Sequence, residues 1–143
     1  MEQMSLARGG FDRHAKTTKR AAFLADMDRV IPWSELAALI EPHYPKAGRG
    51  RRPVGLERML RIHFLQHWFN LSDPAVEEAL YESVSMREFV GIVLGHEPVP
   101  DETTVCKFRH LLERHELGRQ LFGRVGEHLQ AQAFRLSTGT LAD

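Results

Sequence analysis

The segment from Pro53 to Gly91 constrains the fold most strongly, because its apolar residues recur at the spacing of an α-helix. In its first part, large apolar residues return every three or four positions and therefore share one helical face. These residues are Leu56, Met59, Leu60, Phe64, Leu65, Trp68 and Phe69. A helix with such a stripe becomes stable by burying it against other apolar stripes. The pattern therefore predicts a helical domain.

Start and stop signals divide the rest of this segment into two further helices. Asp73 followed by Pro74 predicts a helix start, because Asp accepts hydrogen bonds from free backbone N–H groups and Pro fits the first turn. Ser85 and Glu88 have the spacing of a capping box, and Gly91 suits a helix C-terminus. This succession of helices predicts a centre that resembles a helix-turn-helix motif.

Weaker helical patterns flank this centre on both sides. Their starting points are Thr18, the Pro32 to Ser34 segment, the N-cap candidate Asp101, and a turn at Gly118. We therefore predict an all-α domain of about six helices over residues 16–133. Residues 1–15 have no apolar periodicity and are expected to be disordered.

The last ten residues have a different pattern. Phe134, Leu136 and Thr138 alternate with polar residues, and a Gly-Thr-Leu-Ala-Asp sequence follows. Alternation of this kind is typical of a β-strand. Residues 134–143 are therefore expected to begin a strand of a further domain, and the chain is interpreted as truncated there.

Cysteine content and hydropathy indicate the compartment. The single cysteine, Cys106, has no partner for an internal disulfide, which fits a reducing environment. No apolar run approaches the ~20 residues of a membrane span, and the N-terminus lacks the apolar centre of a signal peptide. We expect a soluble cytoplasmic protein without a membrane partner.

The net charge is zero, but the charges are unevenly distributed. Residues 1–53 contain ten Lys or Arg against six Asp or Glu, a balance of +4, and the remainder has a balance of −4. The basic excess peaks at Lys46, Arg49, Arg51 and Arg52, in a segment interrupted by Gly48 and Gly50. Such a loop either follows a phosphate backbone or serves as a solvated linker, and the sequence favours neither.

The helix expected after Asp101 has two distinct faces. Val105, Phe108 and Leu112 form its apolar side at ~100° per residue. The opposite side carries hydrogen-bond donors and no acid, as expected for a helix that contacts phosphates and base edges. Its residues are Thr103, Lys107, His110 and Arg114. The alternative is an ordinary solvated face.

Arg109 is assigned a structural role. It falls near the apolar side of the same helix, where an unpaired guanidinium would be unfavourable. We expect an ion pair with an acid of the central segment, for which Glu78 is chosen over its neighbours Glu77 and Glu82.

The histidines provide a weak indication of a metal site. His63 and His67 are four residues apart, as are Cys106 and His110, so each pair can share one helical face. A tight zinc site needs three or four ligands in firm spacing. No metal site is therefore predicted from these residues.

Several runs of residues together resemble the N-terminal domain of bacterial insertion-sequence transposases, in particular the family conventionally numbered five. They are Ile31-Pro32-Trp33, Pro42-His43-Tyr44-Pro45, Leu56-Glu57-Arg58-Met59-Leu60-Arg61, Leu71-Ser72-Asp73-Pro74, Glu77-Glu78-Ala79-Leu80-Tyr81, Pro100-Asp101-Glu102-Thr103-Thr104 and Phe108-Arg109-His110-Leu111-Leu112-Glu113. The resemblance extends from about Lys16 onward. It implies a helical domain that binds the terminal inverted repeats of its element and is nucleoid-associated when bound.

The resemblance also implies a following RNase H-like domain, whose two Asp and one Glu hold two Mg²⁺ ions. The first of these carboxylates corresponds to Asp143, after Gly139-Thr140-Leu141-Ala142. One carboxylate cannot hold two such ions. This chain is therefore expected to need no cofactor and to be inactive alone, whereas a full-length member would use Mg²⁺.

We interpret the chain as the part of a transposase that docks on double-stranded element ends for DNA transposition. The alternative is a self-association module, in which the apolar central helices join copies of the transposase without reading bases. A third possibility is an active nuclease that receives its missing carboxylates from a separate catalytic chain.

Overall fold

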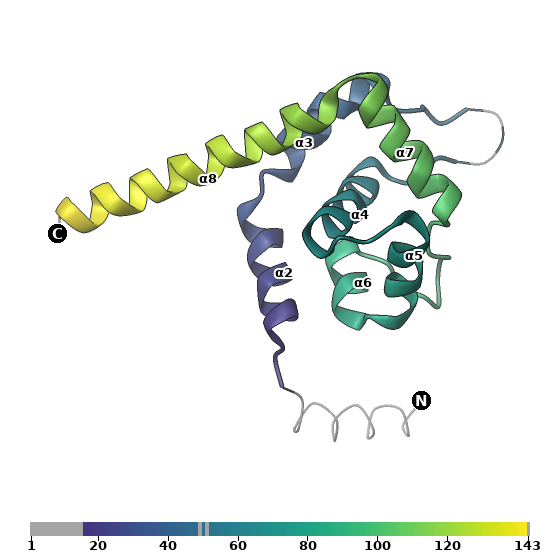
Figure 1. The fold of residues 1–143 in the computed structure, drawn as a ribbon, viewed down its shortest axis with the longest axis horizontal. Helices are drawn as coiled ribbons and strands as arrows, with labels where there is room; N and C mark the ends of the chain where they lie inside the picture. Colours follow the sequence, from purple (N-terminus) through teal and green to yellow (C-terminus); the bar gives the residue numbers. More distant parts are fainter. Residues whose placement is uncertain (1–15, 49, 51, 143) are drawn as a thin grey trace.

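The computed structural model describes residues 16–48, 50 and 52–142, and over these residues the chain is all-helical, without a strand (Figure 1). The predicted all-α fold class is confirmed, with seven α-helices in the described part. The elements are α2 (Lys19–Val30), α3 (Trp33–Ile40), the 3-10 helix η1 (Glu41–His43), α4 (Leu56–Phe69), α5 (Asp73–Glu82), α6 (Val84–Val90), α7 (Glu102–Arg114) and α8 (Leu117–Ala142).

Hydroxyl and carboxylate side chains cap α2, α5, α6 and α7, though not always at the predicted residue. Asp101 caps α7 as predicted, and its Oδ1 accepts the Thr104 N–H at 2.8 Å. The cap of α5 is Ser72 rather than Asp73, and the cap of α6 is Ser83 rather than Ser85. In both cases the hydroxyl accepts the N–H three residues later.

Left-handed residues end two of the helices. Gly91 has φ 85° and ends α6, as predicted. Asn70 has φ 53° and ends α4, and the N–H of Leu71 then donates back to the Gln66 carbonyl at 2.9 Å. This turn gives α4 and α5 their sharp change of direction.

Helix α4 is the centre of the core. Its residues Leu60, Ile62, Phe64 and Leu65 are fully buried. The Phe64 ring lies 5.4 Å from Trp33 of α3 and 4.9 Å from Phe122 of α8, centroid to centroid. Helices α3, α5, α6 and α7 all pack on α4. The predicted apolar stripe of the central segment is thus the stripe that the other helices cover.

The Arg61 side chain joins four helices at the edge of this core. Its Nη1 donates to Asp28 of α2 at 2.5 Å and to the carbonyl of Phe89 in α6 at 2.8 Å. Its guanidinium carbon lies 4.5 Å from the ring centroid of Trp33 in α3. The side chain is only 14% exposed. A partly buried cation is thus satisfied by groups from separate helices.

Helix α8 follows α7 after a tight turn at His115 and Glu116, and Glu116 has φ 51°. The turn therefore precedes Gly118, the residue predicted for it. Figure 1 shows α8 running away from the other helices beyond its first turns. None of the described helices is long and apolar enough to cross a membrane.

The strand predicted after residue 134 is wrong, because α8 continues without a break to Ala142. An extended segment without a neighbouring strand leaves its N–H and C=O groups unpaired, whereas a helix pairs them internally. That a catalytic domain follows stays a prediction. Residues 1–15, Arg49, Arg51 and Asp143 lie outside the described residues.

Replacing Arg61 by Lys should lower the free energy of unfolding by about 1–2 kcal/mol, because Lys keeps the charge but loses the planar group that donates to two helices and faces Trp33. Urea titrations measure the effect. The matched control is Arg29→Lys on α2, whose arginine is 73% exposed and pairs only locally with Asp26. Equal stability of the two variants would contradict the proposed role of Arg61.

Candidate nucleic-acid interface

Helix α7 presents the four predicted donors to solvent. Thr103, Lys107, His110 and Arg114 are all exposed. On the opposite side Val105, Phe108 and Leu112 are between 2% and 5% exposed. The two faces are separated as the periodicity predicts. The outer face offers a hydroxyl, an ammonium, an imidazole and a guanidinium side by side.

Arg109 lies on the flank of α7 that faces α5, and its partner is Asp73 rather than Glu78. Its Nη2 and Nε donate to the two carboxylate oxygens of Asp73 at 2.8 and 3.1 Å. Nη1 lies 3.3 Å from Glu113 on the next turn of α7. The arginine is half-exposed, with 38% of its side chain accessible, whereas the Asp73 side chain is 14% exposed. The pair is therefore bidentate and only partly buried.

Ser72 explains why Asp73 is the partner. Because the Ser72 hydroxyl caps α5, the Asp73 carboxylate need not accept the backbone N–H groups of its own helix. It accepts instead from Arg109 and from the Gln66 amide of α4 at 2.9 Å. The hydrogen bonds from Arg109 are the main reason that the pKa of Asp73 falls to about 2. The Asp73 carboxylate of α5 thus bonds to both α7 and α4.

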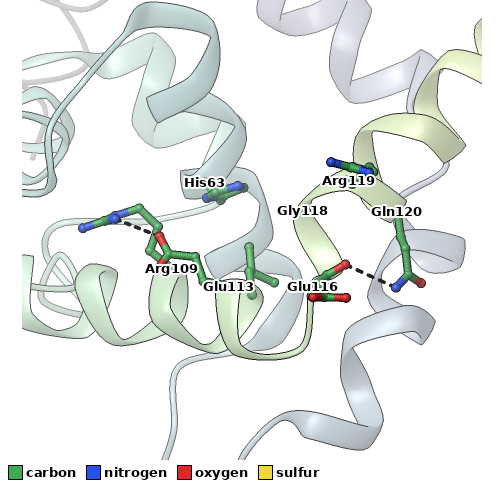
Figure 2. Close-up of a pocket in the computed structure, with 8 residues that line it drawn as sticks. His63, Arg109, Glu113, Glu116, Gly118, Arg119 and Gln120 are labelled. Carbon is green, nitrogen blue, oxygen red and sulfur yellow. Dashed lines mark hydrogen bonds and ion pairs between the residues drawn. The ribbon is translucent and has the colours of Figure 1, made fainter.

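His63 of α4 lies beside this ion pair and lines two pockets. One pocket, of about 640 Å³, is bounded by His63, Arg109 and the start of α8, including Arg119 (Figure 2). The other, of about 530 Å³, lies between His63, His67 and the Asp73 region. Burial is the main reason that the pKa of His63 falls to about 4, and the nearby His67 and Arg109 charges lower it further. At neutral pH His63 is therefore uncharged.

The basic loop is attached to α7 through the residues that precede it, and its two ends are joined to each other. Before the loop, the His43 ring stacks on His115, at the end of α7, with centroids 3.9 Å apart. The Tyr44 ring lies 6.1 Å from Phe108, and its hydroxyl donates to the carbonyl of Val54, just after the loop. The structure therefore attaches the start of the loop to the inner face of α7 and to the residue that follows this helix.

Within this loop, the described cations point into solvent. Lys46 and Arg52 are exposed, while Arg49 and Arg51 lie outside the described residues. Sequence reasoning missed the attachment of the loop to α7, because contacts between rings far apart in the chain leave no periodic signal. The one sequence signal for this attachment is the pair of ring residues His43 and Tyr44, which lies between two prolines just before the loop.

Neither the His63–His67 pair nor the Cys106–His110 pair has a third possible metal ligand beside it among the described residues. Cys106 Sγ lies 3.7 Å from Nε2 of His110, and His63 and His67 line a common pocket. Within residues 16–48, 50 and 52–142, no group of three or more His, Cys, Asp or Glu could hold a metal ion. Asp143, the residue that the resemblance implicates in Mg²⁺ binding, lies outside this part.

Comparison with known proteins yields one family. The family model described as "Transposase domain (DUF772)" matches residues 11–111 of the chain. The match covers α2 to α6 and most of α7, and so includes the ion pair and the basic loop. No solved structure matches the chain.

The Asp73–Arg109 pair should stabilise the domain in a pH-dependent way. Because the folded pKa of Asp73 is lowered from 3.8 to about 2, its contribution is present above pH 4 and is lost as the pH falls towards 2. At pH 7 we expect Asp73→Asn to lower the free energy of unfolding by about 1–2 kcal/mol, allowing for the exposure of Arg109. Denaturant titrations should show this difference shrinking as the pH is lowered from 4 to 2. Glu78→Gln, the control at the exposed acid, should have little effect at either pH.

Proposed function

This chain belongs to the transposase-domain family, and from that premise we propose that it is the DNA-binding part of a transposase, which docks on the terminal inverted repeats of an insertion sequence. The observation that supports this most is the acid-free outer face of α7, a helix to which the start of the basic loop is also attached. Neither feature alone is specific. Together, the helix and the loop attached to it offer donors for base edges and cations for phosphates.

The outer face of α7 suits the major groove of DNA. An α-helix fits the width of that groove, where each base pair presents its own pattern of donors and acceptors. Arg114 can donate in a bidentate manner to guanine, and Lys107 and His110 can donate to base edges or phosphates. All three are exposed and follow one another along the helix.

The loop supplies the electrostatic attraction that a chain of zero net charge otherwise lacks. Phosphate contacts by Lys or Arg release counterions and contribute much of the affinity for DNA, without reading its sequence. Because Tyr44 and Val54 hold the ends of the loop together, fewer conformations are lost when the loop meets DNA. We infer that the loop lies along a phosphate backbone while α7 enters the adjacent groove.

Other arginines are already engaged within the fold. Arg58 pairs with Glu97 at 2.5 Å and donates to the Gly91 carbonyl at 2.8 Å. Arg61 is held between helices, and Arg109 is held by Asp73. Releasing any of them would leave its partner unsatisfied. This supports α7 and the loop, rather than α4, as the DNA-binding surface.

The burial of α4 weighs against the alternative in which the central helices join copies of the protein. Its large apolar residues Phe64, Leu65 and Leu60 are covered by the domain's own helices. Exposing them to a second copy would require unfolding the core. Self-association, if it occurs, needs another surface.

Replacing Lys107 or Arg114 by Ala should weaken binding to a duplex carrying the element end by about 1–3 kcal/mol where the side chain contacts a base. The preference for this duplex over a random one should fall as well. Fluorescence anisotropy at fixed salt measures both quantities. Arg29→Ala on α2 removes one exposed cation elsewhere and serves as control. Unchanged affinity and preference in both α7 variants would refute base readout by this helix.

Replacing Arg49, Arg51 and Arg52 together by Gln should flatten the plot of log affinity against log salt by roughly 2–3 units, because each lost phosphate contact removes a slope of about 0.9. Affinity should fall similarly on cognate and random duplexes. The control changes three exposed cations near α2 to Gln, namely Lys16, Lys19 and Arg29. If the loop is only a linker, the two triple variants will have equal slopes.

A further inference from the structure

The first turn of α7 lies in an acidic part of the molecule. Helix α5 packs against α7 and contains no Lys or Arg, and residues 97–106 contain none either. Three carboxylates meet at this end of the helix, namely those of Asp101, Glu102 and Glu77. A polyanion that approached this end would be repelled by them.

Two of these carboxylates also occupy the backbone donors of the helix N-terminus. The Asp101 Oδ1 accepts the Thr104 N–H at 2.8 Å, and the Glu77 Oε1 accepts the Glu102 N–H at 2.6 Å. Free N–H groups at a helix N-terminus are the groups that bind phosphate. In α7 they are bonded within the fold, so this end offers a DNA backbone little attraction.

The C-terminal half of α7 has the opposite character. Lys107, His110 and Arg114 are exposed along it, and none of the ion pairs formed among the described residues involves Lys107 or Arg114. The one acid in this half is Glu113, which lies 3.3 Å from Arg109 one turn earlier (Figure 2). Arg114 in the last turn also offsets the partial negative charge of the C-terminal carbonyl groups.

The basic loop begins at this same end of the helix. Its first attachment is the His43 ring, which stacks on His115, the residue that follows α7. The described cations of the loop, Lys46 and Arg52, are exposed. Both sources of positive charge that the proposed function uses are therefore connected to the C-terminal half of α7, and neither is connected to its first turn.

We propose that α7 meets double-stranded DNA with its C-terminal half, so that Lys107, His110 and Arg114 face the duplex and the first turn stays clear of the phosphates. This inference rests on the proposed DNA binding and adds the direction in which the helix is presented. It reverses the arrangement of helix-turn-helix proteins in which the N-terminal residues of the recognition helix contact the bases.

Two exposed glutamates provide matched positions for a probe of this direction. Glu102 and Glu113 are eleven residues apart, so at ~100° per residue they lie on the same side of α7. They are separated by about 16 Å along the helix at 1.5 Å per residue. The full chain with Cys106→Ser, which removes its only thiol, serves as the parent. Glu102→Cys or Glu113→Cys is then added and labelled with an iron–EDTA group that cleaves DNA near it.

Cleavage is measured on a mixed-sequence duplex of roughly 30 base pairs at about 50 mM salt, where phosphate contacts hold DNA irrespective of sequence. Normalised to bound duplex, the group at position 113 should cleave at least about fivefold more DNA than the group at position 102, given their separation along the helix. Equal cleavage from both positions, or stronger cleavage from position 102, would overturn the proposal. Fluorescence anisotropy of the unlabelled parent comes first, and a parent that binds no duplex would refute the proposed function together with this inference.

Charge neutralisation tests the direction without any change at Cys106. Glu113→Gln should raise the affinity for the same duplex about two- to threefold at low salt, because it removes a negative charge beside the phosphates. Glu102→Gln, the matched change at the other end, should alter the affinity by less than about 1.5-fold. Circular dichroism melting should confirm that both variants stay folded. A larger gain from Glu102→Gln than from Glu113→Gln would show that the N-terminal end faces the DNA.

Discussion

The arrangement of the helices depends on where the guanidinium of Arg61 is held. An arginine that is 14% exposed needs most of its donors satisfied, and the groups that satisfy it lie on different helices. Asp28 comes from α2, the Phe89 carbonyl from α6, and the Trp33 ring from α3. Apolar stripes alone can slide or rotate against one another at little cost. A directional cation with fixed partners selects one arrangement, because any other leaves the network incompletely satisfied.

A second polar anchor fixes α7 on the other side of the core. The Asp73 carboxylate binds Arg109 of α7 in a bidentate manner and also accepts from Gln66 of α4. Aromatic contacts from Tyr44 and His43 complete the attachment. The outer face of α7 is thus presented by a helix whose inner face and flank are both held. Such rigidity favours recognition, since little order has to be created when a partner binds.

Helix positions and caps that depend on local periodicity could be predicted from the sequence. The partner of Arg109 could not, because it depends on which of two neighbouring residues caps a helix. The apolar stripe of α4, the cap Asp101 and the end at Gly91 are local signals, and the structure confirms them. The partner of Arg109 is not local. It was missed because Ser72 and Asp73 are both good caps, and only the folded geometry decides which of them caps α5. The strand expected after residue 134 failed for a related reason, since alternation does not provide a neighbouring strand.

The long α8 also gives the domain a mechanical property. With 26 residues it extends for about 39 Å, and its base is fixed by buried Leu117 and Leu121 and by the Arg124–Glu35 pair. It joins α7 through only two residues, one of them in the left-handed conformation. A rotation of about ten degrees at this corner would displace the far end by roughly 7 Å. Whatever holds the end of α8 therefore acts on a lever arm, and the contacts of Leu117, Leu121 and Arg124 at the base of the helix oppose the resulting torque.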